Sequence, residues 1–231
     1  MGNFWTRLFD LIAPRCCVVC GARLSETEKW FCVNCYLDLP RTGYEAFPET
    51  NPMVEIFEKH FVAERVASWF YYKQSSPSSH IIHELKYHHQ PEIGHYIGRK
   101  VVAEFSSHHF FDGINGLIPM PLTKRRERQR GYNQCLKIAS GISEATGIPI
   151  LDGVVARTRF YESQTHMSTE ERKENVEGAF ELVMPEAVKN RHVLVIDDVV
   201  TTGATMISLC KELLKVPSVR VSIFSVCFTK N

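Results

Sequence analysis

Residues 193–205 read VLVIDDVVTTGAT, and this stretch decides the fold. Its leading residues, 193–196, are all apolar and predict a strand that is buried on both faces. Two carboxylates, Asp197 and Asp198, follow, and a small hydroxyl-rich loop then leads into an amphipathic helix. Backbone N–H groups at a helix start are unpaired, so the loop is a candidate phosphate site. Its residues are Thr201, Thr202, Gly203, Ala204 and Thr205.

These thirteen residues resemble the phosphoribosyl-pyrophosphate (PRPP) motif of type I phosphoribosyltransferases. The resemblance implies a PRPP ligand with Mg²⁺, and it makes Asp197 and Asp198 the candidate catalytic residues, holding the ribose hydroxyls. The loop 201–205 would wrap the 5′-phosphate. Thr201 departs from purine-salvage members, which carry an acid there, so purine salvage is not expected. The alternative, a buried strand followed by a capped helix, leaves the two adjacent carboxylates unexplained.

The rest of the larger region alternates between strand and helix patterns. Strands are predicted over 66–72, 116–120, 192–196 and 219–228, and helices over 80–86, 93–105 and 131–146. The polar stretch 158–178 lacks periodicity and is predicted to be a long loop. This alternation predicts an α/β fold, with a type I phosphoribosyltransferase-like parallel sheet flanked by helices. Ligands of such sheets bind at the carboxyl ends of the strands.

A basic segment, IPMPLTKRRERQRGYNQ at 118–134, also follows a predicted strand. Guanidinium groups suit phosphate oxygens, so this segment is a candidate pyrophosphate or nucleic-acid backbone site. The alternative is a solvated basic face, the usual meaning of a run of charges. The residues predicted to make these contacts are Lys124, Arg125, Arg126 and Arg130.

Five of the eight cysteines lie between residues 16 and 35. Cys17, Cys20, Cys32 and Cys35 form two pairs with two intervening residues each, the spacing of a structural Zn²⁺ site. Cys16 competes with Cys17 but gives poorer spacing. Disulfides and plain buried cysteines are the alternatives, and an expected cytoplasmic, reducing location disfavours disulfides. The other cysteines, Cys135, Cys210 and Cys227, fall on apolar faces and are predicted to be core residues.

Length and composition fit a globular chain with one large and one small domain. The chain has 231 residues, 44% hydrophobic and 23% charged, with a net charge of +1. No apolar run approaches the ~20 residues that a membrane helix needs, so no membrane contact is expected. The predicted division is an N-terminal helix with a zinc module at 1–40, a Pro- and Gly-containing linker at 41–60, and the phosphoribosyltransferase-like domain at 61–231.

Several motifs together resemble the ComF family of competence-associated, phosphoribosyltransferase-like proteins. They are the four cysteines, LKY at 85–87, IPMPL at 118–122, RGYNQ at 130–134, the ER and NVEGAF of 171–180, and VIDDVVTTGAT at 195–205. The resemblance implies a role in natural transformation, with incoming single-stranded DNA and competence or helicase proteins as partners. It also places Arg172 and Asn175 in an active-site flap, where Arg172 would contact pyrophosphate.

Two functions of different classes therefore compete. In the first, the chain is an active PRPP-dependent transferase acting on a nucleobase or another small acceptor. In the second, it is a phosphate-binding factor that handles DNA without turnover, and a PRPP-sensing regulator is a third possibility. Salt dependence separates DNA binding from PRPP binding, because binding to nucleic acid weakens steeply as counterions are released.

Overall fold

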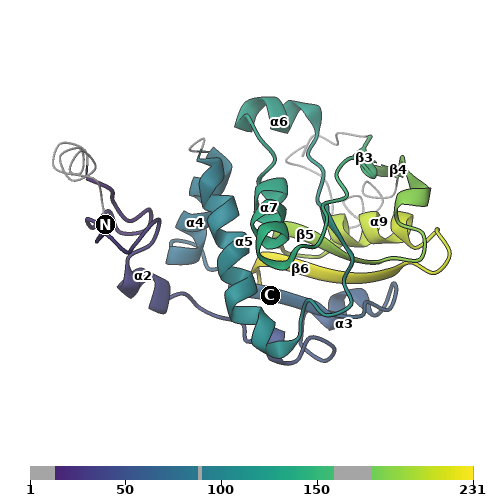
Figure 1. Cartoon of the computed structure of the whole chain (residues 1–231), viewed down its shortest axis with the longest axis horizontal. Helices are drawn as coiled ribbons and strands as arrows, with labels where there is room; N and C mark the ends of the chain where they lie inside the picture. The colour runs from purple at the N-terminus through teal and green to yellow at the C-terminus, as the bar shows by residue number, and fades with distance from the viewer. Residues whose placement is uncertain (1–13, 88–89, 159–177, 231) are drawn as a thin grey trace, which may run out of the picture.

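The computed structural model describes residues 14–87, 90–158 and 178–230. Four parallel strands form the central sheet in the order β1-β6-β5-β2 (Figure 1). They are β1 (Val66–Tyr71), β2 (Gly116–Pro119), β5 (His192–Val200) and β6 (Arg220–Phe228). The strand pattern of the sequence therefore predicted all four. Residues 193–196 of β5 are fully buried, as continuous apolar strands of a covered parallel sheet should be.

The main helices are α4 (Pro77–Tyr87), α5 (Pro91–Phe105), α6 (Lys124–Arg130), α7 (Gln134–Thr146) and α9 (Ala204–Leu213). Helices α7 and α9 contact the sheet, and α5 packs against α4 and α7. Helices α5 and α7 lie side by side (Figure 1). Their crossing is close because Gly98 and Gly141 carry no side chain there: a Cβ on Gly141 would lie 2.0 Å from the carbonyl oxygen of His95. The chain thus has the predicted α/β architecture, a parallel sheet flanked by helices.

Strand β5 is longer than the apolar run predicted. It continues through the two acids to Val200, because β6 is equally long and pairs with it as far as Phe228. Asp197 pairs with Ser225, so the acids lie in the last part of the strand rather than beyond it. Cys135, Cys210 and Cys227 are fully buried, as the sequence predicted.

Smaller elements complete the described chain. These are α2 (Val33–Leu37), η1 (Tyr44–Ala46), α3 (Val54–Phe57), η2 (Ser106–His108), η3 (Pro185–Ala187), and the antiparallel pair β3 (Val155–Arg157) and β4 (Phe180–Leu182). The sequence did not predict them, because each is too short to show a hydrophobic period. The helix expected before Pro14 and most of the loop expected at 158–178 lie outside the described residues.

The stretch 41–60, expected to be a linker, is packed against the sheet. Tyr44, Met53 and Phe57 are buried in the main hydrophobic core. The Thr42 N–H donates to the carbonyl of Trp69 in β1, at 3.1 Å. Proline and glycine are common in tightly turning packed segments as well as in linkers, so their presence does not distinguish the two. The domain boundaries at 40 and 60 stay a prediction.

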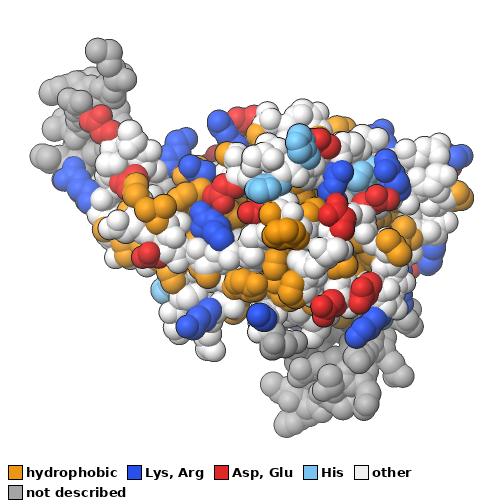
Figure 2. Space-filling view, turned by 90° about the horizontal axis from the view of Figure 1, so that it is seen from below, with side chains coloured by type: hydrophobic (Ala, Val, Ile, Leu, Met, Phe, Trp, Pro, Cys, Tyr) orange, Lys and Arg blue, Asp and Glu red, His pale blue; other side chains and the backbone are white. Residues whose placement is uncertain are grey.

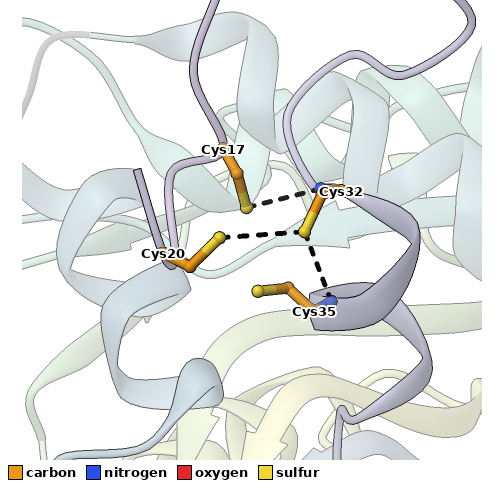
Figure 3. A group of neighbouring side chains, drawn as sticks. All are labelled: Cys17, Cys20, Cys32 and Cys35. Atoms are coloured by element: carbon orange, nitrogen blue, oxygen red, sulfur yellow. Dashed lines mark hydrogen bonds between the residues drawn. The ribbon is translucent and has the colours of Figure 1, made fainter. Parts of the chain in front are cut away.

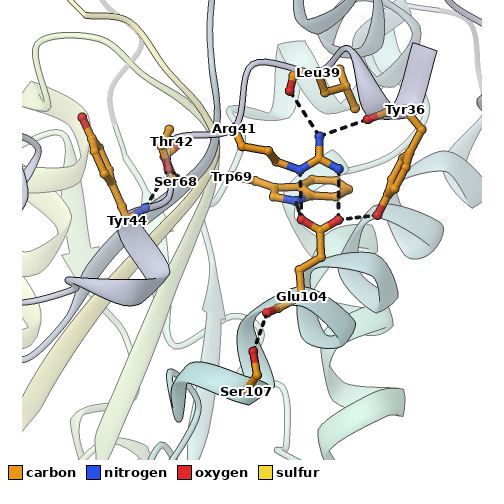
Figure 4. Close-up of polar contacts among 9 residues, drawn as sticks. All are labelled: Tyr36, Leu39, Arg41, Thr42, Tyr44, Ser68, Trp69, Glu104 and Ser107. Carbon is orange, nitrogen blue, oxygen red and sulfur yellow. Dashed lines mark hydrogen bonds and ion pairs between the residues drawn. The ribbon is translucent and has the colours of Figure 1, made fainter. Parts of the chain in front are cut away.

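Glu104 of α5 joins the N-terminal module to the sheet (Figure 4). Its carboxylate accepts hydrogen bonds from Arg41 Nε at 2.9 Å, from Arg41 Nη2 at 3.1 Å and from Trp69 Nε1 at 2.7 Å. The Tyr36 hydroxyl, on α2, donates to it as well. The Arg41 guanidinium also lies over the rings of Tyr36 and Trp69, at 4.7 and 5.2 Å from their centroids. One carboxylate therefore connects α2, α5 and β1.

The surface seen from below mixes apolar areas with charges of both signs (Figure 2). Lys and Arg alternate there with Asp and Glu, so no single sign dominates this face. Across the described ranges, none of the helices combines the length and hydropathy needed to cross a bilayer.

Candidate functional site

The turn between β5 and α9 forms a small anion-sized pocket. A space of about 50 Å³ is lined by Asp197 and by residues 199–206. Gly203 caps α9 with φ +76°, a conformation that favours glycine, and a Cβ there would lie 2.6 Å from Cγ2 of Ile56. Helix α3 thus presses against this turn from outside. The sequence-predicted loop and its helix N-terminus lie together as expected.

The two acids of β5 have different surroundings. Asp198 is only 5% exposed, and its Oδ2 lies 3.2 Å from Lys86 Nζ and 2.8 Å from Gln134 Nε2, which donates to it. The Oδ1 of Asp197 accepts the N–H of Asp198 at 2.8 Å and the thiol of Cys135 at 3.5 Å. Among the described residues, Asp198 is therefore held by an ion pair, whereas the hydrogen-bond partners of Asp197 are neutral.

Burial has the largest effect on the pKa of Asp197. Together with the nearby charge of Asp198, it raises the pKa of Asp197 to about 7, although Lys86 and the backbone N–H of Asp198 act in the opposite direction. Burial also raises the pKa of the Cys135 thiol, and Asp197 adds to the effect, so this thiol stays protonated and donates to Asp197. A divalent cation or a sugar hydroxyl near Asp197 would favour its ionised form.

A larger cleft of about 250 Å³ adjoins the loop and brings cations to the acids. Asp197, Asp198, Thr201 and Thr205 line one part of it. The cations that line it are Lys86, Arg126, Arg130 and Arg157. With four cations against two carboxylates, the cleft has an excess of positive charge and suits a polyanion.

The basic run 124–130 is a short helix, which the sequence did not predict. Thr123 caps it by accepting the N–H of Arg126 at 3.3 Å, and Gly131 ends it in a left-handed conformation. Its side chains are exposed except that of Arg130, which is partly buried. Arg126 and Arg130 line the cleft, whereas Lys124 and Arg125 are not among its lining residues. Arg172 lies outside the described residues.

Sequence reasoning missed three residues of the cleft: Lys86, Gln134 and Arg157. Lys86 belongs to LKY and Gln134 to RGYNQ, so both motifs contained the signal without showing their contact with Asp198. Arg157 follows a short apolar run at the end of β3 and carries no motif. Arg157 adds a cation to the lining of the cleft, and no sequence motif predicted it there.

Hydrogen bonds from the RGYNQ motif fix the position of Gln134. The Asn133 side chain accepts the N–H groups of Cys135 and Leu136 at 2.9 and 3.4 Å, which caps α7. Its Nδ2 donates to the carbonyl of Met120 just after β2, at 3.1 Å. The Tyr132 hydroxyl donates to the carbonyl of Leu85 at 2.6 Å, next to Lys86. These bonds fix both residues that hold Asp198.

The four predicted cysteines come together (Figure 3). Their sulfurs all lie within 4.8 Å of one another, and those of Cys20 and Cys32 are 3.8 Å apart. Cys17 Sγ accepts the N–H of Cys32 at 3.3 Å, and Cys32 Sγ accepts that of Cys35 at 3.5 Å. Burial alone would raise the pKa of Cys17, but backbone N–H groups outweigh it and lower the pKa to about 7. The cluster could hold a metal ion.

Cys16 lies outside this cluster. It is exposed, and its thiol donates to the carbonyl of Pro14 at 3.4 Å. The cluster therefore contains Cys17 and not Cys16, and the assignment of Cys17 as a metal ligand stays a prediction.

Comparison with known proteins agrees with this architecture. Residues 133–231 match the family model described as "Phosphoribosyl transferase domain". "DNA utilization protein YhgH" of Shigella flexneri is 30% identical over 216 residues, covering 92% of this chain and 90% of the relative. "Competence protein F" of Haemophilus influenzae is 32% identical over 143 residues, covering 60% of this chain and 62% of the relative.

A glutamine PRPP amidotransferase from B. subtilis is among the similar solved structures. It has a TM-score of 0.42 and 18% identity, with 62% of this chain and 30% of that chain covered. The Shigella flexneri relative matches 92% of the chain, and the family model matches its C-terminal part. The chain belongs to the ComF family of phosphoribosyltransferase-like proteins.

Proposed function

We propose that this chain binds PRPP, or a related phosphosugar, in the cleft beside the 201–205 loop. The observation that carries the proposal is the convergence of a phosphate-sized pocket, two carboxylates and four cations on one space. PRPP offers a matching set of groups: a phosphate, two sugar hydroxyls and a pyrophosphate. Neutral ligands would gain little from this excess of cations.

Each part of the ligand has a proposed partner. The N–H groups at the start of α9 and the hydroxyls of the loop would bind the 5′-phosphate. Asp197 and Asp198 would accept the ribose hydroxyls. The Oε1 of Gln134 is buried with no hydrogen-bond partner among the described residues, so it could accept a further ligand hydroxyl. The basic residues Lys124, Arg125, Arg126, Arg130 and Arg172 are proposed for pyrophosphate or nucleic acid.

Two metal ions belong to the proposal, Mg²⁺ with PRPP and a structural Zn²⁺. Carboxylate oxygens such as those of Asp197 are hard ligands, and Mg²⁺ usually binds one or two carboxylates together with substrate phosphates. When bound, Mg²⁺ would supply charge neutralisation for the pyrophosphate oxygens.

The cysteine cluster fits zinc by its dimensions. A tetrahedral site with Zn–S bonds of ~2.3 Å places sulfurs about 3.8 Å apart, and Cys20 and Cys32 have this separation. Four thiolates leave no open position, so the role of this ion is structural. We expect one Zn²⁺ per chain in an elemental assay of protein purified without added metal. A folded sample without zinc would contradict this assignment.

The cellular role that we propose is the handling of incoming single-stranded DNA during natural transformation, in the cytoplasm. The names of the relatives, a DNA utilization protein and a competence protein, support it. The exposed basic helix α6 supports it too, because its five cations outnumber its one acid, Glu127, whereas charges of both signs mix on the face seen from below (Figure 2). The cysteine module is a proposed contact for a helicase or another competence protein.

Calorimetric titration of Mg²⁺–PRPP tests the site, with a short DNA single strand titrated in parallel. We expect saturable PRPP binding by the wild type and none by Asp197→Asn with Asp198→Asn. Glu181→Gln, an exposed acid on β4, is the matched control and should bind as wild type. Circular dichroism must show that the double variant is folded. Unchanged PRPP affinity in a folded double variant would refute the site, and DNA binding that ignores salt would refute the DNA role.

A further inference from the structure

Arg157, at the end of β3, forms no ion pair with any carboxylate of the described residues. Its guanidinium lies 5.3 Å from the centroid of the Phe180 ring on β4. Its Nε is buried and has no hydrogen-bond partner within the part of the chain that the structure describes. No carboxylate of the described residues forms an ion pair with Arg157 or with Arg126, although both line the cleft.

Such an arrangement costs free energy in the ligand-free protein. Charged side chains are rarely buried unless they are paired, because burial removes their hydration. Burial lowers the pKa of Arg157, and the nearby charge of Arg126 lowers it further, whereas only Asp197 acts to raise it. Two guanidinium groups that repel each other across a cleft are a common arrangement where an anion binds between them.

We infer that Arg157 and Arg126 form a binding site for an oxyanion group, a phosphate or a carboxylate, of a ligand in the cleft. The inference rests on the proposed function, because it assumes that the cleft is the ligand site. Arg126 comes from α6 and Arg157 from β3, so the anion would connect two elements far apart in sequence. Packing against Phe180 restricts the guanidinium and reduces the entropy lost on binding.

Two sources can supply this oxyanion. One is the pyrophosphate of PRPP, and the other is an acidic group on a second ligand that shares the cleft. Both sources place an oxyanion at Arg157, and a neutral nucleobase has no such group.

The substitution Arg157→Met separates these outcomes, because methionine keeps an unbranched apolar stem against Phe180 and removes the charge. The probes are Mg²⁺–PRPP, pyrophosphate and ribose 5-phosphate, each measured by calorimetry. Loss of a charge-assisted hydrogen bond should weaken the binding of pyrophosphate and PRPP by about 10- to 100-fold. The affinity for ribose 5-phosphate should not change. Arg157→Lys should recover part of the affinity. Arg220→Met, an exposed arginine on β6, is the control.

A separate titration tests the second source, an acidic second ligand. If pyrophosphate binds the variant as it binds wild type, orotate and uracil are titrated into protein saturated with ribose 5-phosphate. Orotate binding that is lost in Arg157→Met, with uracil not binding, assigns the site to an acidic second ligand. If Arg157 binds an anion, removing its charge should also raise the Tm of the ligand-free protein. If Arg157 has a structural role instead, the Tm of Arg157→Met should fall.

The inference is overturned if Arg157→Met binds every probe as wild type does, or if it weakens all of them equally with a lower Tm. These results would leave PRPP binding by the wild type intact. Failure of the proposed function itself looks different, because the wild type would then not bind PRPP at all.

Discussion

Replacing Glu104 by alanine should loosen the attachment of the N-terminal module. The carboxylate accepts from Arg41, from Trp69 and from the Tyr36 hydroxyl, and these donors come from three separate segments (Figure 4). In Glu104→Ala, the Arg41 guanidinium would stay next to two aromatic rings without its only described ion-pair partner. The expected result is a less stable chain whose cysteine module separates more readily from α5.

The size of the effect follows from the number of donors and their exposure. Hydrogen bonds to a charged group contribute about 1.5–3 kcal/mol each, and removing one partner of a buried ion pair costs about 3–5 kcal/mol. The side chains of Arg41 and Glu104 are 28% and 27% exposed, so water can replace part of the loss. We therefore expect a destabilisation of about 3 kcal/mol, which for a chain of this size lowers Tm by about 6–12 °C.

Differential scanning calorimetry of zinc-loaded protein measures this change, and the rate of zinc release to a chelator reports on the module itself. Glu104→Gln should fall between wild type and Glu104→Ala, because its amide oxygen can still accept one or two bonds. Glu92→Ala, an exposed acid in the first turn of the same helix, should stay within ~0.5 kcal/mol of wild type. A Glu104→Ala melting within ~2 °C of wild type would show that the reasoning is wrong.

Three further predictions concern pH and the phosphate loop. Burial acts to raise the pKa of Glu104, but the bonds from Arg41, Tyr36 and Trp69 outweigh it and lower the pKa. The stabilisation of the folded chain by ionised Glu104 should therefore be complete above pH 4.5, the ordinary pKa, and be lost as the pH falls below it. Acid unfolding of the wild type, compared with that of Glu104→Gln, measures this loss. Because the pKa of Asp197 is raised to about 7, Mg²⁺-dependent PRPP affinity should increase between pH 6 and pH 8, and a flat calorimetric profile would contradict this. Gly203→Ala should lower the free energy of unfolding by about 2 kcal/mol or more and abolish most PRPP binding, because a left-handed backbone costs an L-residue ~1–2 kcal/mol and the new Cβ would clash with Ile56. Gly147→Ala has a similar φ but open space around the new Cβ, so this control should show the cost of the backbone strain alone.

The sheet could be predicted because its signal is local. Continuous apolar runs marked the buried strands. Only the end of β5 was misplaced by more than one residue, because the apolar run does not show how far β5 pairs with β6. Helix α6 was missed for the opposite reason. Its residues are nearly all charged, so it has no hydrophobic period, and it forms because Thr123 and Gly131 cap its two ends.

The candidate site likewise has parts that a short stretch of sequence predicts and parts that depend on distant residues. The 201–205 loop and the cysteine cluster are each built from short stretches, so spacing was enough to predict their members. Asp198 is held instead by Lys86 of α4 and Gln134 of α7, which are separated from it by 112 and 64 residues. A motif shows that a residue type stands at a position but not which distant side chain it meets. Both LKY and RGYNQ supply a side chain that holds Asp198, and within the described ranges Asp197 is left as the carboxylate of the cleft with no ion-pair partner.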